Sequence, residues 1–356
     1  MAPSGKNYKK IVIKVGSSLF CSKSGAFEAA ALNKLVKQLV GLAKDSKVKF
    51  VIVSSGAIAL GMSRLKLSSR PKELSVLQAA AAIGQNILMD SYGKAFKEHN
   101  IAQILLTWDD FNDRSRYLNA KKTLDTLLKL NCVPIVNEND TVSIDEIKFG
   151  DNDRLSALVA TMVSADLLII LSDVEGLLDN EKKLVKVVEE INWQIKALAS
   201  PSEKKTSVGG MITKIEAARI SVDSGIPCVI ASGKEENIIR RIAGDPFSRG
   251  GWTVFAPRKG LTERDRWIAF GTKPKGRITV DDGAKKALLN RKSLLSVGVT
   301  AVESSFEDGS VVSVIDKSGC EFARGKVSVS SKIIDEVKGQ HFAREIIHRD
   351  NIVVLN

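Results

Sequence analysis

Apolar residues follow two different spacings along the first two-thirds of the chain. Short runs rich in β-branched residues recur between longer stretches in which apolar residues return every three or four positions. The short runs predict buried strands, and the longer period predicts amphipathic helices. The expected strands are 11–15, 50–53, 102–106, 133–136, 166–171 and 227–230, and the expected helices are 28–44, 74–96, 119–130, 155–163 and 212–224.

Uninterrupted apolar strands that alternate with helices are typical of a mostly parallel sheet covered on both faces. The sequence therefore predicts a three-layer α/β/α sandwich with a mostly parallel central sheet. Right-handed crossovers place the carboxyl ends of such strands along one edge, where open α/β sheets bind ligands. Polar residues follow the first, second, fourth and fifth expected strands, so we expect them to meet at that edge.

The pattern changes near Pro257. The next residues combine Pro, Gly and many charges, which is typical of a linker with some packed content. From Gly276 onward, short β-branched segments surround one short helix and predict a small, mainly β, barrel-like domain. The expected strands there are 277–280, 297–302, 311–315 and 326–329, the helix is 283–289, and the expected division is a first domain at 1–256, a linker at 257–275 and a second domain at 276–356.

Composition narrows the class of protein. The 356 residues are 44% hydrophobic and 26% charged, as in ordinary globular proteins. No apolar run approaches the roughly 18 residues of a membrane helix, and the first residues lack the apolar centre of a secretory signal. The four cysteines are far apart with no CxxC pair, which favours reduced, buried or near-buried thiols in a cytoplasmic protein. The net charge of +12 is spread in short runs and favours a solvated surface.

Asn and Asp cluster in two segments, 137–140 and 148–154. The second precedes the expected helix at 155–163, so Asp151 or Asn152 is expected at its N-cap. Backbone N–H groups at such a helix start can face an amino-acid zwitterion, a phosphate or Mg²⁺. A capped helix that merely follows a turn is the alternative, and these segments alone do not decide between the two.

Two lysines lie where a bound anion would explain them. Lys14 lies inside the first apolar strand, where an ammonium group is costly without a partner. Lys214 lies in the first turn of an expected helix that opens with Gly209 and Gly210, against the preference of the helix dipole. Phosphate groups would satisfy both lysines. An edge-strand lysine and a plain loop-to-helix transition are the alternatives.

The second strand ends in Ser54 and Ser55, followed by Gly56 and Ala57, which could hold a substrate carboxylate. With the lysines, these residues indicate phosphoryl transfer, whose main demand on a protein is neutralisation of charge. The chain has only three histidines, no GxxxxGK[ST] loop and no GxSxG motif, and no general base stands out. This fits an acceptor that is already an anion, such as a carboxylate with a pKa of about 4.3.

A resemblance to a known family is carried by residues 13–18 (IKVGSS), 53–59 (VSSGAIA), 133–140 (VPIVNEND), 149–153 (FGDND) and 209–214 (GGMITK). In this order they resemble the amino acid kinase family, and within it the branch that phosphorylates glutamate. The tail resembles a PUA domain through residues 276–284 and 293–299. The resemblance spans nearly the whole chain.

The resemblance implies ATP-dependent phosphorylation of the γ-carboxylate of L-glutamate to L-glutamyl 5-phosphate, the first step toward proline. It implies that Lys14 and Lys214 contact the ATP phosphates and that Asp153 orients both lysines. Mg²⁺ would bridge phosphate oxygens through waters and the nucleotide itself, with no protein ligand assigned. The implied glutamate-binding residues are Ser55, Gly56, Ala57, Asn137, Asp140 and Asn152, and the implied ATP-binding residues are Lys14, Gly16, Ser172, Asp173, Gly209, Gly210, Met211 and Lys214.

Three features depart from the family pattern. The Gly-Thr-Gly-Gly stretch that is usual before the second lysine reads SVGG at residues 207–210, so Val208 lacks a hydroxyl that could touch phosphate. The segment between Asp173 and Gly209 is short, which bears on ATP affinity and base preference as well. Ser54 stands where a threonine is common.

The resemblance further implies a homo-oligomer, either a dimer or a tetramer, and feedback inhibition by proline at the glutamate site. Two other functions stay open: a related kinase for aspartate, acetylglutamate or uridylate, and an RNA-binding protein with an inactive kinase half. The PUA-like tail and the paired Asn/Asp segments argue against the first. Residues 257–356 carry 18 Lys and Arg against 13 Asp and Glu, a weak excess for RNA binding.

Overall fold

The computed structural model describes residues 8–21, 27–143, 152–199, 210–248, 250–257 and 262–355. Two compact units divide the chain, and each contains its own sheet and its own apolar core. Within the described ranges, no helix combines the length and the apolar composition that a membrane span requires. The first unit is Met1–Asp110 with Ser115–Gly260, and the second is Phe111–Arg114 with Leu261–Asn356.

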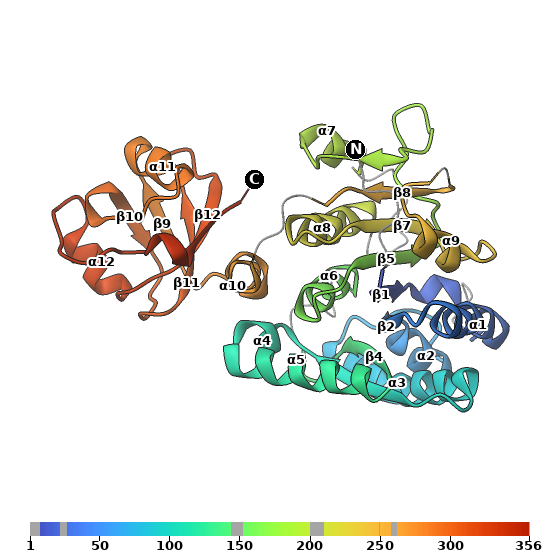
Figure 1. Ribbon diagram of the computed structural model, residues 1–356. Coiled ribbons are helices and arrows are strands. Elements are labelled where there is room, and N and C mark those ends of the chain that lie inside the picture. The colour runs from blue at the N-terminus through green and yellow to red at the C-terminus, as the bar shows by residue number, and fades with distance from the viewer. Residues whose placement is uncertain are drawn as a thin grey trace. The chain divides into compact units, whose positions relative to one another are not determined.

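A mostly parallel sheet of eight strands forms the centre of the first unit (Figure 1). β1 (Lys10–Val15) lies between β2 (Lys49–Ser54) and β5 (Leu167–Ser172) and runs parallel to both. β7 (Cys228–Ser232) pairs antiparallel with β8 (Trp252–Phe255). The predicted mostly parallel sheet is confirmed. The order across the sheet is β3 (Ile101–Leu106), β4 (Val133–Glu138), β2, β1, β5, β7, β8 and β6 (Val187–Val188).

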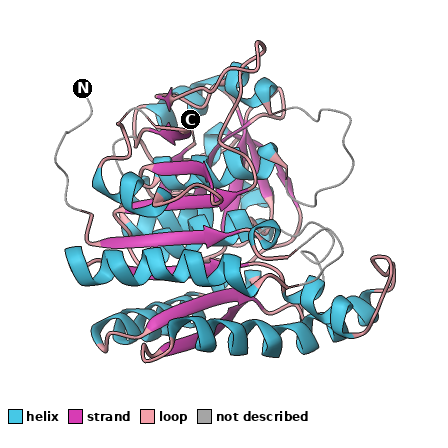
Figure 2. Cartoon of the chain, turned by 90° about the vertical axis from the view of Figure 1, so that its right-hand side faces the viewer, coloured by secondary structure: helices cyan, strands magenta, loops and turns pink. Residues whose placement is uncertain are grey.

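Helices cover both faces of this sheet (Figures 1 and 2), so the predicted α/β/α sandwich is confirmed. One face carries α1 (Ala29–Ser46), α3 (Leu74–Phe96) and α9 (Ile238–Gly244), which share a core with the strands. The other carries α6 (Asn152–Met162) and α8 (Met211–Asp223), which pack against each other. The remaining helices before residue 200 are η1 (Ser17–Leu19), α2 (Ala57–Arg64), α4 (Trp108–Asn112), α5 (Arg114–Lys129) and α7 (Trp193–Leu198).

The side chains of β1 are apolar on the face that packs against α1 and α3 and include a lysine on the opposite face. Ile11, Ile13 and Val15 point into the core that contains α1 and α3. Because side chains alternate along a strand, Lys14 points to the opposite face, toward α6. Lys14 is only 7% exposed and lies on a central strand, so it is not the edge-strand lysine that the sequence left open.

The second unit contains a five-stranded sheet with its own core. Its strands are mostly antiparallel, and β9 and β11 are the parallel pair. The predicted small, mainly β domain is confirmed. Across the sheet the strands are β10 (Val299–Glu303), β9 (Arg277–Val280), β11 (Val311–Ile315), β12 (Glu321–Lys326) and β13 (Ile352–Val354); the helices are α10 (Glu263–Arg266), η2 (Trp267–Gly271), α11 (Asp282–Leu289), η3 (Ser296–Gly298), α12 (Ser331–Val337) and η4 (Arg349–Asn351).

Three details of the sequence interpretation are wrong. The strand expected at 326–329 does not form. Of these residues only Lys326 belongs to a strand, as the last residue of β12. Val327 and Val329 alternate with serines and are both buried, so they imitate a strand without pairing as one. The helix expected at 119–130 begins five residues earlier, at Arg114. Cys320, expected to be buried or nearly so, is exposed.

Candidate active site

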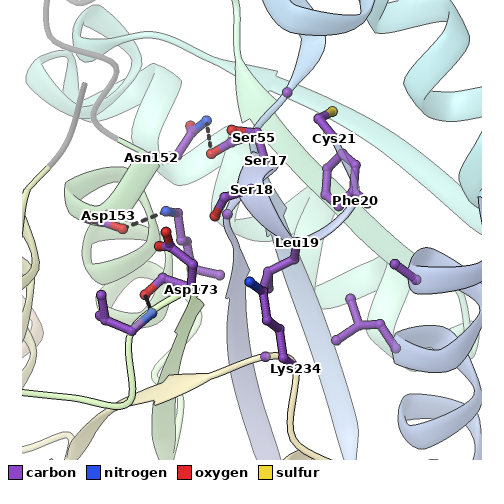
Figure 3. Close-up of a pocket in the computed structure, with 18 of the residues that line it drawn as sticks. Ser17, Ser18, Leu19, Phe20, Cys21, Ser55, Asn152, Asp153, Asp173 and Lys234 are labelled. Atoms are coloured by element: carbon purple, nitrogen blue, oxygen red, sulfur yellow. Dashed lines mark hydrogen bonds and ion pairs between the residues drawn. The ribbon is translucent and has the colours of Figure 1, made fainter. Parts of the chain in front are cut away.

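A large cleft lies at the carboxyl ends of the strands of the first unit (Figure 3). Residues that follow β1, β2, β5 and β7 line it, as the parallel topology requires. Its volume is about 2930 Å³, whereas a pocket for one drug-sized ligand occupies roughly 300–1,000 Å³. The cleft therefore has room for two ligands side by side.

Two lysines meet one carboxylate at the floor of this cleft. Lys14 Nζ lies 2.7 Å from Asp153 Oδ1, and Lys214 Nζ lies 3.1 Å from Asp153 Oδ2. The lysines come from β1 and from the first turn of α8, and Asp153 comes from the first turn of α6. All three side chains are buried, and the two ammonium groups share this one carboxylate.

Asp153 is ionised because of its partners. Burial alone would raise the pKa of Asp153, but the two lysine charges and a hydrogen bond from Thr213 outweigh it and lower the pKa to about 2. Thr213 Oγ1 donates to Asp153 Oδ2 at 2.8 Å. A fixed carboxylate of this kind holds both ammonium groups in place before any ligand arrives.

Among the described residues, no side chain caps the start of α8 beside the lysine cluster. Its N-cap residue is Gly210, which offers no side chain to satisfy the first N–H groups of the helix. Met211 and Lys214 line the cleft in the first turn. Gly209 and Val208 lie outside the described residues, so their predicted contacts stay predictions.

Asn152 connects the residues in the half of the cleft that the ends of β2 and β4 form. Its Nδ2 donates to Ser54 O at 3.2 Å, Ser55 Oγ at 3.0 Å (dashed in Figure 3) and Asn137 Oδ1 at 3.1 Å. Asn152 is the first residue of α6 rather than its N-cap, and Asp151 lies outside the described residues. Among the described residues, its Oδ1 is buried without a hydrogen-bond partner. A ligand that donates a hydrogen bond would satisfy this oxygen.

Asp140 adds a carboxylate to this half. Burial raises the pKa of Asp140 to about 6, and the charge of Arg70 opposes the rise. Both side chains line the cleft. Nearby, Gly56 has a φ of 109°, a conformation that favours glycine, and it turns the chain from β2 into α2 at Ala57.

Ser172 and Asp173 lie at the end of β5, in the part of the cleft that also contains Gly16. Gly16 N donates to Leu171 O at 3.1 Å, which ties the loop after β1 to β5. Lys234, which follows β7, also lines the cleft (Figure 3). The sequence interpretation did not select Lys234, Thr213 or Arg70, because a single lysine, threonine or arginine in a loop or helix carries no distinctive spacing.

All the predicted site residues that the structure describes line this one cleft. They converge from segments up to 200 residues apart in the chain. Within the described ranges, no group of three or more His, Cys, Asp or Glu could hold a metal ion. The residues brought together are Lys14, Gly16, Ser55, Gly56, Ala57, Asn137, Asp140, Asn152, Asp153, Ser172, Asp173, Gly210, Met211 and Lys214.

Comparison with known proteins gives consistent matches. The profile of the Amino acid kinase family matches residues 9–232, and that of the PUA domain matches residues 276–349. The chain is 44% identical to a glutamate 5-kinase of Caldanaerobacter subterraneus subsp. tengcongensis, over 97% of this chain and 98% of that protein. A glutamate 5-kinase of Dictyoglomus turgidum is also 44% identical, over 98% of both chains.

Solved structures with a similar fold include carbamate kinase from Giardia. One such structure superposes with a TM-score of 0.51 at 18% identity and covers 71% of this chain and all of its own. A second, Giardia lamblia carbamate kinase bound to AMP-PNP, has a TM-score of 0.51 at 15% identity, over 70% of this chain and 99% of its own. At these identities the likeness concerns the fold alone.

Proposed function

Because this chain belongs to the amino acid kinase family, we propose that it is a glutamate 5-kinase. It transfers the γ-phosphoryl group of ATP to the side-chain carboxylate of L-glutamate and yields L-glutamyl 5-phosphate and ADP. This is the first step of proline biosynthesis. The observation that carries the proposal is the Lys14–Asp153–Lys214 cluster, which lines the same cleft as the predicted glutamate-binding and ATP-binding residues.

The lysines supply the electrostatic part of the reaction. Negative charge on the transferring phosphoryl group and on the leaving ADP needs fixed cations in a place that excludes water. Lys14 and Lys214 are buried and already oriented by Asp153, so they need little rearrangement to face a phosphate. The acceptor carboxylate has a pKa of about 4.3 and is ionised at neutral pH, so no general base is required.

The amino-acid half supplies groups that match glutamate. Asp140 and the buried Oδ1 of Asn152 are acceptors suited to its ammonium group. Ser55, Gly56 and Ala57 offer a hydroxyl and backbone groups at the start of α2 for a carboxylate. Asn137 Oδ1 accepts a hydrogen bond from Asn152 Nδ2 and so holds the Asn152 side chain in place.

The nucleotide half would hold ATP between the ends of β1 and β5 and the start of α8. Gly16, Ser172, Asp173, Gly210 and Met211 line this part. Mg²⁺ would be held largely by the phosphates and by waters, because Asp153 already uses both oxygens for Lys14, Lys214 and Thr213. When bound, Mg²⁺ neutralises charge on the phosphate oxygens.

The remaining features of the proposal rest on the family resemblance and cysteine usage. They are a kinase domain at 1–256, a linker at 257–275 and a PUA-like domain at 276–356. They also include a cytoplasmic location, a homo-oligomer and feedback inhibition by proline. RNA binding by the PUA-like domain is the weakest part, because the charge excess of residues 257–356 is small.

The direct test is ATP turnover with L-glutamate, with hydroxylamine present to trap the acyl phosphate as a hydroxamate. We expect the wild-type protein to form the hydroxamate and Lys214→Ala to lose roughly 10²–10³-fold in kcat. Lys183→Ala, which removes an exposed lysine away from the cleft, is the control and should match the wild type. If the protein turns over ATP with aspartate, acetylglutamate or uridylate but not with glutamate, the proposed acceptor is wrong.

A further inference from the structure

Two polar side chains of α3 contact the ends of the strands that carry the predicted glutamate-binding residues, and the proposed reaction does not use either of them. Gln85 and Tyr92 lie seven residues apart, which is two helical turns, so they lie on the same side of α3. Gln85 contacts the end of β4, and Tyr92 contacts the end of β2. These two strands are neighbours in the sheet.

Three amides form a directed chain that begins at Gln85. Asn137 Nδ2 donates to Gln85 Oε1 at 2.8 Å, which leaves Asn137 Oδ1 as the acceptor. That oxygen receives hydrogen bonds from Glu138 N at 2.9 Å and from Asn152 Nδ2 at 3.1 Å. Gln85 uses only its oxygen here, since its Nε2 has no hydrogen-bond partner among the described residues.

The direction of this chain decides what Asn152 presents to a ligand. Its Nδ2 is committed to Asn137, Ser55 and Ser54, so its remaining polar atom is the acceptor Oδ1. At neutral pH glutamate has two carboxylates, which only accept hydrogen bonds, and one ammonium group, which only donates. The ammonium group is therefore the part of glutamate that Asn152 Oδ1 can bind.

Tyr92 fixes the neighbouring strand end in a similar way. Its side chain is fully buried, and its hydroxyl lies 2.9 Å from Ser54 Oγ. Ser54 Oγ in turn donates to Ser55 O at 3.2 Å. Burial raises the pKa of Tyr92 well above its ordinary value, so the phenol stays protonated and can donate to Ser54.

We propose that Gln85 and Tyr92 are positioning residues for the amino-acid substrate, Gln85 by setting the direction of the Asn137–Asn152 amide chain and Tyr92 by holding the Ser54–Ser55 strand end. This inference rests on the proposed function, because it names glutamate as the ligand. Neither residue touches the substrate. Their removal raises the KM for glutamate and leaves the nucleotide half undisturbed.

The test compares Gln85→Met, Gln85→Glu and Tyr92→Phe in steady-state kinetics with the full-length enzyme. Gln85→Met removes the acceptor of a neutral hydrogen bond from Asn137 Nδ2, so it should raise the glutamate KM up to about tenfold. Gln85→Glu keeps an acceptor oxygen for Asn137 and should stay within about threefold of the wild type. Tyr92→Phe removes a neutral hydrogen bond and should raise the KM by about 2- to 10-fold.

Two readouts separate positioning from a general structural effect. The ATP KM and kcat should change by less than about threefold in every variant, since the lysine cluster is not contacted. Glutarate, which lacks the amino group, should inhibit Gln85→Met and the wild type equally well, because Asn152 Oδ1 has no donor to bind. Asn86→Ala, an exposed amide next to Gln85, is the control.

The outcomes distinguish the two levels of inference. A wild-type protein that forms no glutamyl phosphate overturns the proposed function and this inference with it. A wild type that phosphorylates glutamate, together with a Gln85→Met variant of unchanged glutamate KM, overturns only the positioning role. Equal losses in Gln85→Met and Gln85→Glu would also overturn it, because the acceptor oxygen would then not matter.

Discussion

Asp153 is the shared counterion of Lys14 and Lys214, and its substitution tests the electrostatics of the site. Asp153→Asn removes the carboxylate that the two buried ammonium groups share, which should lower the free energy of unfolding by about 3–5 kcal/mol. Urea denaturation measures this loss. Thr213→Val, which removes a hydroxyl that contacts both this carboxylate and Gly210 O, should cost about 1 kcal/mol.

A nucleotide should partly compensate for that loss. Phosphate groups of AMP-PNP would replace the missing anion, so the analogue should raise the melting temperature of Asp153→Asn more than that of the wild type.

The dependence of stability on acid pH follows from the pKa of Asp153, which is about 2 compared with an ordinary value of 3.8. Its ionic contribution is complete above about pH 4 and is lost as the pH falls toward 2. Equal nucleotide shifts in both proteins would contradict the role of Asp153.

The proposed contact between Asp140 and the ammonium group of glutamate predicts that glutamate binding depends on pH. The pKa of this buried carboxyl is about 6, so it loses its charge, and its attraction for an ammonium group, as the pH falls through about 6. We expect the glutamate kcat/KM to fall on the acid side with this midpoint, measured between pH 5 and pH 8. Asp140→Asn should have a lower but flat profile. The same inflection in that variant would assign the pKa to another group.

The effect of Asp140 on the free energy of unfolding changes with pH in the opposite direction to its expected effect on glutamate binding. Its folded-state pKa of about 6 exceeds the ordinary 3.8, so the folded protein keeps this proton at a pH where the unfolded chain has released it. Stability from the neutral carboxyl is therefore present below about pH 4 and is lost as the pH rises toward 6. The proposed binding of glutamate favours the ionised form of Asp140, whereas folding favours its neutral form.

At the scale of elements, α2 and α3 approach each other closely at two glycines. A Cβ atom at Gly84 would lie 1.7 Å from Ala57 O, at the start of α2. Gly84→Ala must push α2 away, and this overpacking should cost about 1–3 kcal/mol. Because Ala57 lies in the predicted glutamate site, the glutamate KM should rise as well, while the ATP KM stays nearly constant.

Gly93 on the same helix is the matched control for this prediction. A Cβ atom there would meet only Ile101 Cδ1, at an ordinary 3.9 Å. Gly93→Ala should therefore stabilise the protein by up to about 1 kcal/mol, the usual gain in a helix interior. Thermal denaturation of both variants gives the comparison. A Gly84→Ala protein as stable as Gly93→Ala would mean that the helices can separate freely.

The elements that carry strong periodicity could be predicted from sequence, and those that depend on distant partners could not. The apolar runs of β1, β2 and β5 identify buried strands without further information. α12 and β13 escaped prediction because α12 buries only Ile334 and β13 is three residues long. Neither has enough apolar residues to establish a period.

The site followed the same division. Lys14 and Lys214 could be selected because a lysine in a buried strand or in the first turn of a helix needs an explanation. Gln85 and Tyr92 could not, because a glutamine and a tyrosine in a long Ala-rich helix are ordinary surface and core residues in sequence. Their contacts depend on the order of β2 and β4 in the sheet, which the sequence pattern does not specify.

At the scale of the whole molecule, the two units have separate cores, which predicts separable stability. Leu288 is fully buried in the core of the second unit, and its neighbour Leu289 is 52% exposed. Leu288→Ala should cost the second unit about 2–5 kcal/mol and produce an earlier calorimetric transition. Glutamate turnover below that transition should stay normal. Leu289→Ala should leave both transitions in place, and a single transition shifted as a whole by Leu288→Ala would contradict independent cores.

The central position of β1 also constrains the order in which a newly made chain can fold. Both neighbours of β1 must be present before it is paired on each side, and β5 is not complete until Ser172. At about 5–20 residues per second, the ribosome needs ~10 s or more to supply them. Until then, the strand that bears Lys14 keeps an open edge. Ribosome-stalled chains of about 160 residues should therefore be digested by protease near β1, and chains of about 260 residues should resist.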